Sequence, residues 1–229
     1  MARTRTLTDM DLTPLVARFG SEDKARGYLE QLRWPDGVRC PRCDASKGIS
    51  RIEKRGQFDC DSCGYQFSVG AGTIFHASHL PLWKWLLAVY VMCESDSGVS
   101  ANQLKRMLGV SYKTAWYLCH RIRAAMRDEA PRALLRIAGT DEVQEAPMIE
   151  QRVLDAAPRP GGRANAVWSL FRRSVAGSYH HLSPKHLPAY LDETAFRYKN
   201  RENAFRFRDT LVRLIESEAM PYSELVAGE

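Results

Sequence analysis

Six cysteines are the residues of this chain with the clearest chemical potential, and four of them stand in two closely spaced pairs. Cys40 and Cys43 form one CxxC pair, and Cys60 and Cys63 form the second pair a short distance further along the chain. This spacing is typical of zinc sites, in which each tight turn offers two thiolates to one tetrahedral ion. Because four thiolates leave no open coordination position, we expect one structural zinc ion per chain rather than a catalytic one.

Two other roles are open to these cysteines, namely a pair of disulfides or a redox centre. A reducing compartment disfavours disulfides, and redox chemistry would need one CxxC pair rather than two at this spacing. Cys93 and Cys119 lie in apolar helical patterns, where a free cysteine usually acts as a small hydrophobic core residue.

The elements that must position the cysteines are short and rich in strand-forming residues. Segments 48–55, 57–60 and 65–69 predict two or three strands of a small ribbon. A helix is expected from Ser21, as its N-cap, to about Leu32, and residues 1–20 are expected to be a loosely ordered basic arm.

A second group of elements follows the ribbon and has helical periodicity. A helix should begin at Pro81, and a short helix should run from Ser100 to Leu108. Gly109 suits the helix stop, and Ser111 can cap a longer helix to about Met126. A short helix, a glycine-containing turn and a longer helix are the pattern of a helix-turn-helix.

The longer helix has two different faces. Its apolar face carries Ala115, Leu118, Cys119, Ile122 and Met126, whereas the other face has donors, cations and an aromatic ring but no acid. Such a face suits the major groove of DNA, although a plain three-helix bundle with a solvated polar face would look similar. The candidate DNA-binding residues are Ser111, Tyr112, Lys113, Thr114, Tyr117, His120 and Arg121.

Charge is distributed unevenly along the 229 residues, whose net charge is +6. The segment 1–136 contains 21 basic and 14 acidic side chains, and the segment 137–229 contains 12 and 13. The basic part favours a polyanionic partner, for which double-stranded DNA is our expectation. No apolar run approaches the length of a membrane span, and the segment 1–20 has no continuous apolar core, so we expect a cytoplasmic, nucleoid-associated protein.

The rest of the chain predicts helices separated by a linker. Residues 155–162 have the composition of a linker, and helices are expected from Asn165, from between Pro184 and Pro188 to Tyr198, and over 204–217. The predicted fold class is α+β, with parts at 1–36 (arm and helix), 37–70 (zinc ribbon), 71–130 (trihelical helix-turn-helix domain), 131–163 (linker and truncated remnant) and 164–229 (C-terminal helices).

Several segments together have the look of one known family. The segments are YLEQLRWPDGVRCPRC (28–43), QFSV (66–69), GTIFH (72–76), LPLWKW (80–85), GVSYKTAW (109–116), WSL (168–170), GSYHHLSPKHL (177–187) and FRYKNR (196–201). They resemble bacterial insertion-sequence transposases of the zinc-ribbon DDE type, over roughly residues 12–130 and 165–201. The resemblance implies that the zinc ribbon and helix-turn-helix bind transposon ends. It also implies a ribonuclease-H-like domain that cuts and joins DNA with two metal ions held by Asp, Asp and Glu.

The catalytic residues of that family do not carry over. Asp141 matches the first aspartate, no residue matches the second, and Asn165 stands where the resemblance places the glutamate. The segment 142–164 that separates Asp141 from Asn165 is too short for the strands and helices of a ribonuclease-H core. The helices at the C-terminal end are therefore expected to be a remnant of that domain, and magnesium is expected only if catalysis survives.

Three functions remain open from the sequence. The first is a transposase-derived protein that binds specific duplex DNA without catalysis, such as a repressor or regulator. The second is a transposase, or transposase subunit, that cleaves and joins DNA together with a full-length partner. The third is a zinc-ribbon module that binds another protein, with the C-terminal helices as the surface of a homo-oligomer.

Overall fold

The computed structural model describes residues 13–127, 134, 136, 148–150, 154 and 160–226. It divides into two compact units. The ribbon unit contains the described residues up to Val89 and those from Phe207 onwards, and the helical unit contains those from Tyr90 to Arg206. Both boundaries fall inside helices, α3 (Leu82–Glu94) and α11 (Arg206–Glu216). This division differs from the five parts that the sequence predicts.

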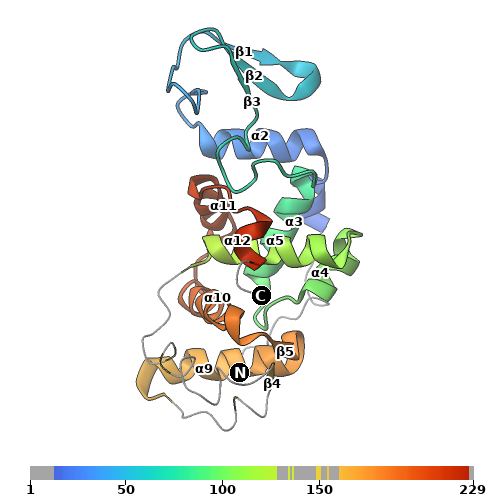
Figure 1. Ribbon diagram of the computed structural model, residues 1–229, viewed down its shortest axis with the longest axis vertical. Helices are drawn as coiled ribbons and strands as arrows, with labels where there is room; N and C mark the ends of the chain where they lie inside the picture. Colours follow the sequence, from blue (N-terminus) through green and yellow to red (C-terminus); the bar gives the residue numbers. More distant parts are fainter. Residues whose placement is uncertain are drawn as a thin grey trace. The chain divides into compact units, whose positions relative to one another are not determined.

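A small antiparallel sheet is the distinctive element of the ribbon unit (Figure 1). Its strands follow chain order, β1 (Ile49–Ile52), β2 (Gln57–Cys60) and β3 (Tyr65–Phe67). A 3₁₀ turn, η2 (Glu53–Arg55), joins the first two strands, and Ile52 pairs with Gln57 across it. The strand expected over 57–60 is confirmed, whereas the strands expected over 48–55 and 65–69 are both shorter than predicted.

Two helices precede the sheet. The second, α2 (Glu22–Arg33), begins after Ser21, whose hydroxyl accepts a hydrogen bond from the Lys24 N–H as expected of an N-cap. The first is α1 (Thr13–Phe19). Residues 1–20 were expected to be a loosely ordered arm, and for the part of them that the structure describes this prediction is wrong. Leu15 and Phe19 are four residues apart and buried, and the Phe19 ring lies 4.7 Å from that of Tyr28. Packing of this apolar stripe against α2 therefore explains why this short helix forms.

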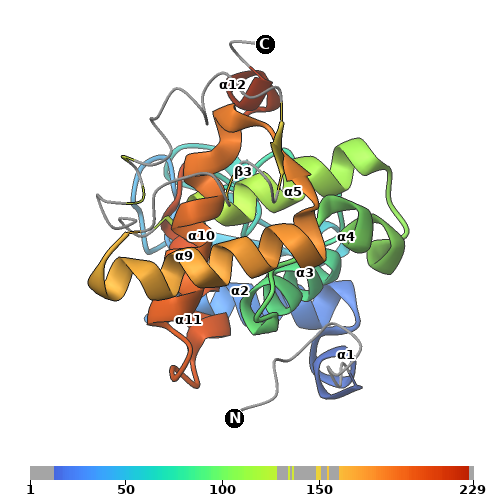
Figure 2. The same ribbon diagram turned by 90° about the horizontal axis from the view of Figure 1, so that it is seen from below.

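After the C-terminal end of α3, the helical unit contains the two helices expected of a helix-turn-helix, α4 (Ala101–Leu108) and α5 (Tyr112–Ala125). Towards its C-terminal end lie α9 (Gly162–Ser174), a π-helical turn η3 (Val175–Tyr179), a 3₁₀ turn η4 (Pro184–His186) and α10 (Leu187–Lys199). Helix α10 packs against both α9 and α5 (Figure 2). A two-stranded antiparallel pair, β4 (Ile149–Glu150) and β5 (His181–Leu182), completes the unit.

A continuous apolar core fills the helical unit around α9 and α10. Its largest members include Trp168 and Phe171, which are 1% and 0% exposed. Leu134, Ile149 and Leu154, from the stretch predicted as linker and remnant, are also buried in this core. Gly162 was expected in the linker but is the first residue of α9. This stretch is therefore more than a connection between the parts on either side of it, because its buried apolar side chains pack in the core of the helical unit.

The remaining helix is α12 (Tyr222–Val226), after α11 in the ribbon unit. Helices together with a small sheet confirm the α+β class. Among the described residues, no helix combines the length and the hydrophobicity needed to cross a membrane.

Candidate metal centre and nucleic-acid interface

Two similar turns of the ribbon unit hold the four paired cysteines. In the first turn the Asp44 N–H donates to the Cys40 carbonyl at 2.9 Å, and in the second the Gly64 N–H donates to the Cys60 carbonyl at 2.8 Å. Asp44 and Gly64 have φ values of 58° and 64°, which close each turn in the left-handed region. Both CxxC pairs therefore present their thiols to the same side of a tight turn.

The four sulfur atoms meet at one point. All four Sγ atoms lie within 4.8 Å of one another, with 3.7 Å between Cys40 and Cys63 and 3.6 Å between Cys43 and Cys60. Zinc bonded to four sulfurs at about 2.3 Å would separate them by roughly 3.8 Å, so the donor set fits a tetrahedral zinc ion. All six cysteines are free thiols in the structure.

The pKa values of the Cys40 and Cys63 thiols are shifted in opposite directions. Burial disfavours the Cys40 thiolate, but hydrogen bonds from the backbone N–H groups of Arg42 and Cys43, together with those from the Cys43 and Cys63 thiols, outweigh it and lower the pKa of Cys40 to about 7. Burial and a hydrogen bond with the Cys43 thiol raise the pKa of Cys63 to about 12. A zinc ion would supply the positive charge that allows such a cluster to lose its protons together.

A small aromatic core lies beneath the cysteines. Phe58 and Phe67 are buried, their rings are 5.7 Å apart, and Trp34 packs edge-on against both. This core joins the end of α2 to the sheet and contains the buried Cys40 and Cys60. A cluster of this size is small for a folding unit, which is why a metal ion is expected to stabilise it.

The turn between α4 and α5 has the capping that the sequence predicts. Ser100 and Gln103 form a reciprocal capping box at the start of α4, and Gly109 ends that helix with a φ of 61°. The Ser111 hydroxyl then accepts from the Thr114 N–H at 3.1 Å and caps α5. These caps confirm the helix boundaries on which the helix-turn-helix prediction depends.

The first turn of α5 is open to solvent. Tyr112 is 50% exposed, Ser111 and Lys113 are exposed, and Thr114 is half-buried, as is Tyr117 in the following turn. No acidic residue lies in this turn. Because the N-terminal residues of a recognition helix are the ones that reach base edges, this turn has the chemistry and the exposure of a DNA-reading element.

The expected exposure of His120 and Arg121 is wrong, because both side chains are buried, at 3% and 4% exposure. The His120 ring lies 4.6 Å from that of His186 and 5.8 Å from that of Tyr190, so η4 and α10 cover this part of α5. Arg121 instead lies over the Tyr117 ring at 5.0 Å. The apolar face is confirmed, since Ala115, Leu118, Cys119, Ile122 and Met126 are all buried.

A buried ionic network ties α5 to α10. Glu193, which is 0% exposed, has its Oε2 atom 2.6 Å from Arg123 Nε. Its Oε1 atom accepts from the Tyr179 hydroxyl at 2.9 Å and lies 3.3 Å from Arg197 Nε. The two arginines also donate to backbone carbonyls before α4, Arg123 to that of Val99 and Arg197 to those of Ser95 and Asp96. No local sequence pattern pairs residues 70 positions apart, so the sequence does not reveal this network.

The structure describes one of the two residues considered for catalysis. Asp141 lies outside the described residues. Asn165 is exposed on α9, three positions before the buried Trp168. In the described part of the chain, the four cysteines form the single cluster of acidic, histidine or cysteine side chains arranged to hold a metal ion.

Two separate segments of the chain match families of known proteins. Residues 20–66 match a family described as a transposase zinc-ribbon domain, and residues 156–199 match one described as an ISXO2-like transposase domain. The chain is 35% identical over 134 residues to a Halobacterium salinarum protein described as an uncharacterized protein in transposable element ISH50. That match covers 57% of this chain and 43% of the relative, so the chain spans less than half of that relative's length. No solved structure matches the chain.

Proposed function

We propose that this chain, in which residues 20–66 match a transposase zinc-ribbon domain and residues 156–199 match an ISXO2-like transposase domain, binds specific duplex DNA through the N-terminal part of α5 and does not cleave it. Ser111, Tyr112, Lys113, Thr114 and Tyr117 are the proposed contacts. His120 and Arg121 leave this set because their side chains are buried. Such a protein would act as a repressor or regulator, or as a competitor of an intact transposase that shares its target.

The exposed, acid-free N-terminal turn of α5 is the observation that carries this proposal. A hydroxyl, a phenol and an ammonium group can donate to bases or phosphates, and nothing negative in that turn opposes the backbone of DNA. The helix is held in place by the Ser111 cap at one end and by the Arg123–Glu193 ion pair near the other. A reader held in this way loses little conformational freedom on binding.

Zinc has a structural role in this proposal. One ion per chain, bound by Cys40, Cys43, Cys60 and Cys63, would join the two turns of the ribbon unit without an open position for substrate. Magnesium is not part of the proposal, because Asn165 cannot supply the charge of the glutamate that the family uses.

Selection of bound duplexes from a random pool, followed by titration of the selected duplex, tests the function. Lys113→Ala should weaken binding of that duplex by roughly 1–3 kcal/mol if Lys113 reads a base. If Lys113 touches only phosphate, binding should weaken equally for all sequences and the salt slope should fall by about one.

Arg173→Ala is the matched control, because Arg173 is an exposed cation of the same unit but lies on α9. It should bind the selected duplex like the parent protein. Equal losses in the two variants would mean that overall charge rather than α5 drives binding. A failure to bind any duplex, at low or high salt, would favour the protein-interaction function instead.

A further inference from the structure

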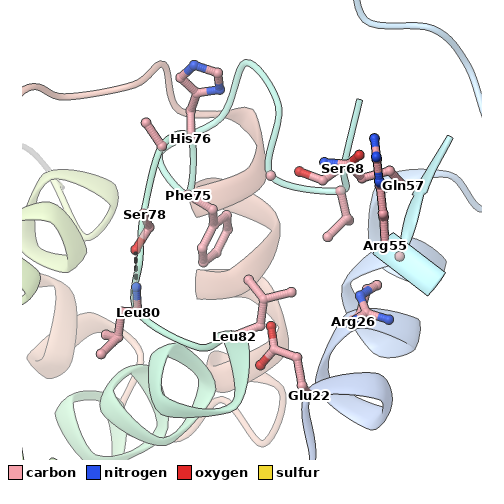
Figure 3. Close-up of a pocket in the computed structure, with 14 residues that line it drawn as sticks. Glu22, Arg26, Arg55, Gln57, Ser68, Phe75, His76, Ser78, Leu80 and Leu82 are labelled. Carbon is pink, nitrogen blue, oxygen red and sulfur yellow. Dashed lines mark hydrogen bonds between the residues drawn. The ribbon is translucent and has the colours of Figure 1, made fainter. Parts of the chain in front are cut away.

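A groove of about 310 Å³ opens in the ribbon unit, away from the four cysteines (Figure 3). Its walls come from α2, from the turn between β1 and β2, and from the segment that follows β3. It holds two arginines, an amide and hydroxyls beside the buried ring of Phe75. Neither the cysteine cluster nor the first turn of α5 uses this groove.

Three of the polar side chains gather at one end of the groove. Figure 3 shows Arg55, Gln57 and Ser68 close together on one side, and Glu22 beside Leu82 on another. Arg55 is exposed, whereas Gln57 and Ser68 are half-buried. The cationic end therefore combines a guanidinium with an amide and a hydroxyl, and the carboxylate lies apart from it.

A second guanidinium is held against the same turn. Gly56 has a φ of 58°, and a Cβ atom placed there would collide with the guanidinium of Arg26. The missing side chain thus leaves room for Arg26 to lie against the backbone of the turn that carries Arg55. Arg26 also contacts Asp23 at 2.8 Å, but that carboxylate is 88% exposed, and such surface pairs are weak.

We propose that the Arg26, Arg55, Gln57 and Ser68 end of this groove binds a backbone phosphate of duplex DNA. Guanidinium groups match the oxygens of a phosphate with paired hydrogen bonds, and hydroxyl and amide groups add neutral donors. The contact carries no base information, so it positions the ribbon unit on DNA of any sequence. This inference rests on the proposed function only in taking duplex DNA as the partner.

Salt-dependent binding of a mixed-sequence duplex tests the site, using the zinc-loaded full chain. Arg55→Gln should reduce the slope of log affinity against log salt by about one, which is roughly a fivefold loss of affinity near 0.15 M salt. Arg55 is exposed, so its replacement should leave the fold intact, which circular dichroism and zinc content would verify.

Lys54→Gln is the matched control, since Lys54 is an exposed cation in the same turn but does not line the groove. Its effect should be less than half that of Arg55→Gln. Equal effects, or none in either variant, would overturn the site, because the turn would then contribute only diffuse charge or nothing.

The same titrations distinguish this inference from the proposed function. If selection finds no preferred sequence but Arg55→Gln still weakens binding of the mixed-sequence duplex, the phosphate site is supported and sequence-specific binding by α5 is contradicted. If the selected duplex binds normally and Arg55→Gln changes neither affinity nor slope, reading by α5 stands and the phosphate site falls. If neither duplex binds the parent protein, both fall.

Discussion

In each cysteine pair the first thiol is buried and the second faces outward. Cys40 and Cys60 are 1% and 0% exposed, whereas Cys43 is exposed and Cys63 is half-buried. The buried pair packs with the Phe58 and Phe67 rings, so metal binding at the turns also secures the aromatic core. Removing the ion would leave that core as the main source of stability for the three-stranded sheet, and a core of this size contributes little.

Cys60→Ser should abolish zinc binding, because serine removes one of four sulfur ligands and leaves a weaker hard donor in its place. Metal analysis of the parent protein should give close to one equivalent of zinc per chain. Cys119→Ala is the control, because this buried thiol belongs to α5 and should not affect the metal content. A zinc-free parent protein with two intact disulfides would contradict the prediction.

His120 should make the helical unit sensitive to acid. Burial, then the charge of Arg123 and the proximity of His186, lowers the pKa of His120 from 6.5 to about 2. The unfolded chain therefore binds a proton below pH 6.5 that the folded chain refuses, so stability is lost as the pH falls. Between pH 6.5 and 5 the free energy of unfolding should fall by about 1.6 kcal/mol on account of this residue.

The measurement is urea unfolding at several pH values for the parent protein and for His120→Gln, which should have a flatter pH dependence in this range. His79→Gln serves as the control, because His79 is exposed in the ribbon unit. Identical pH profiles for the parent protein and His120→Gln would contradict the burial argument.

At the scale of elements, the sequence correctly predicts the features that depend on interactions between residues close together in the chain. Ser100, Gly109 and Ser111 mark the ends of α4 and α5 correctly, because caps and left-handed stops act within one turn. The cysteine spacing likewise predicts the cluster of sulfurs. The burial of His120 could not be predicted, because the covering elements η4 and α10 lie far along the chain and only the tertiary fold brings them to α5.

Helix α5 should depend on α10 for stability through Glu193. Glu193→Gln would leave Arg123 and Arg197 buried near a neutral amide, and an uncompensated buried charge of this kind costs about 3–5 kcal/mol. Denaturant unfolding should show this loss, and duplex binding should weaken with it, since Arg123 belongs to α5, the helix proposed to contact DNA.

Glu202→Gln is the comparison that isolates burial. Glu202 belongs to the same unit and pairs with Arg201 at 3.3 Å, but it is 85% exposed. Exposed pairs contribute up to about 1 kcal/mol, so this variant should unfold close to the parent midpoint. Similar losses in both variants would show that the network is not a special link between α5 and α10.

At the scale of the molecule, the segment that matches the ISXO2-like transposase domain does not stand apart from the helix-turn-helix. Helices α9 and α10 lie within residues 156–199, yet they belong to the same compact unit as α4 and α5. The core that α9 and α10 share also takes in Leu134, Ile149 and Leu154. Residues between the two matched segments, Leu134, Ile149 and Leu154 among them, thus contribute to the core of this unit.

The last prediction is that the protein neither cleaves nor joins DNA. Two-metal chemistry needs carboxylates from separate elements, brought together by a core that holds them a few ångströms apart. At the positions that the resemblance to insertion-sequence transposases assigns to the first aspartate and the glutamate, this chain has Asp141 and Asn165. Only the short segment 142–164 separates them, and an asparagine cannot replace the charge of a glutamate. The core around Trp168 and Phe171 is packed with apolar side chains, and the described residues bring no cluster of carboxylates together.

Incubation with magnesium or manganese and a labelled duplex bearing a selected binding site should therefore leave the DNA intact while the protein stays bound. Adding an intact transposase that recognises the same site should show competition, with less cleavage as this protein is added. Metal-dependent nicking that disappears in Asp141→Ala would instead make the protein an enzyme. Cleavage that rises when both proteins are present would identify it as a subunit that acts with a full-length partner, because a competitor for the same site can only reduce the yield.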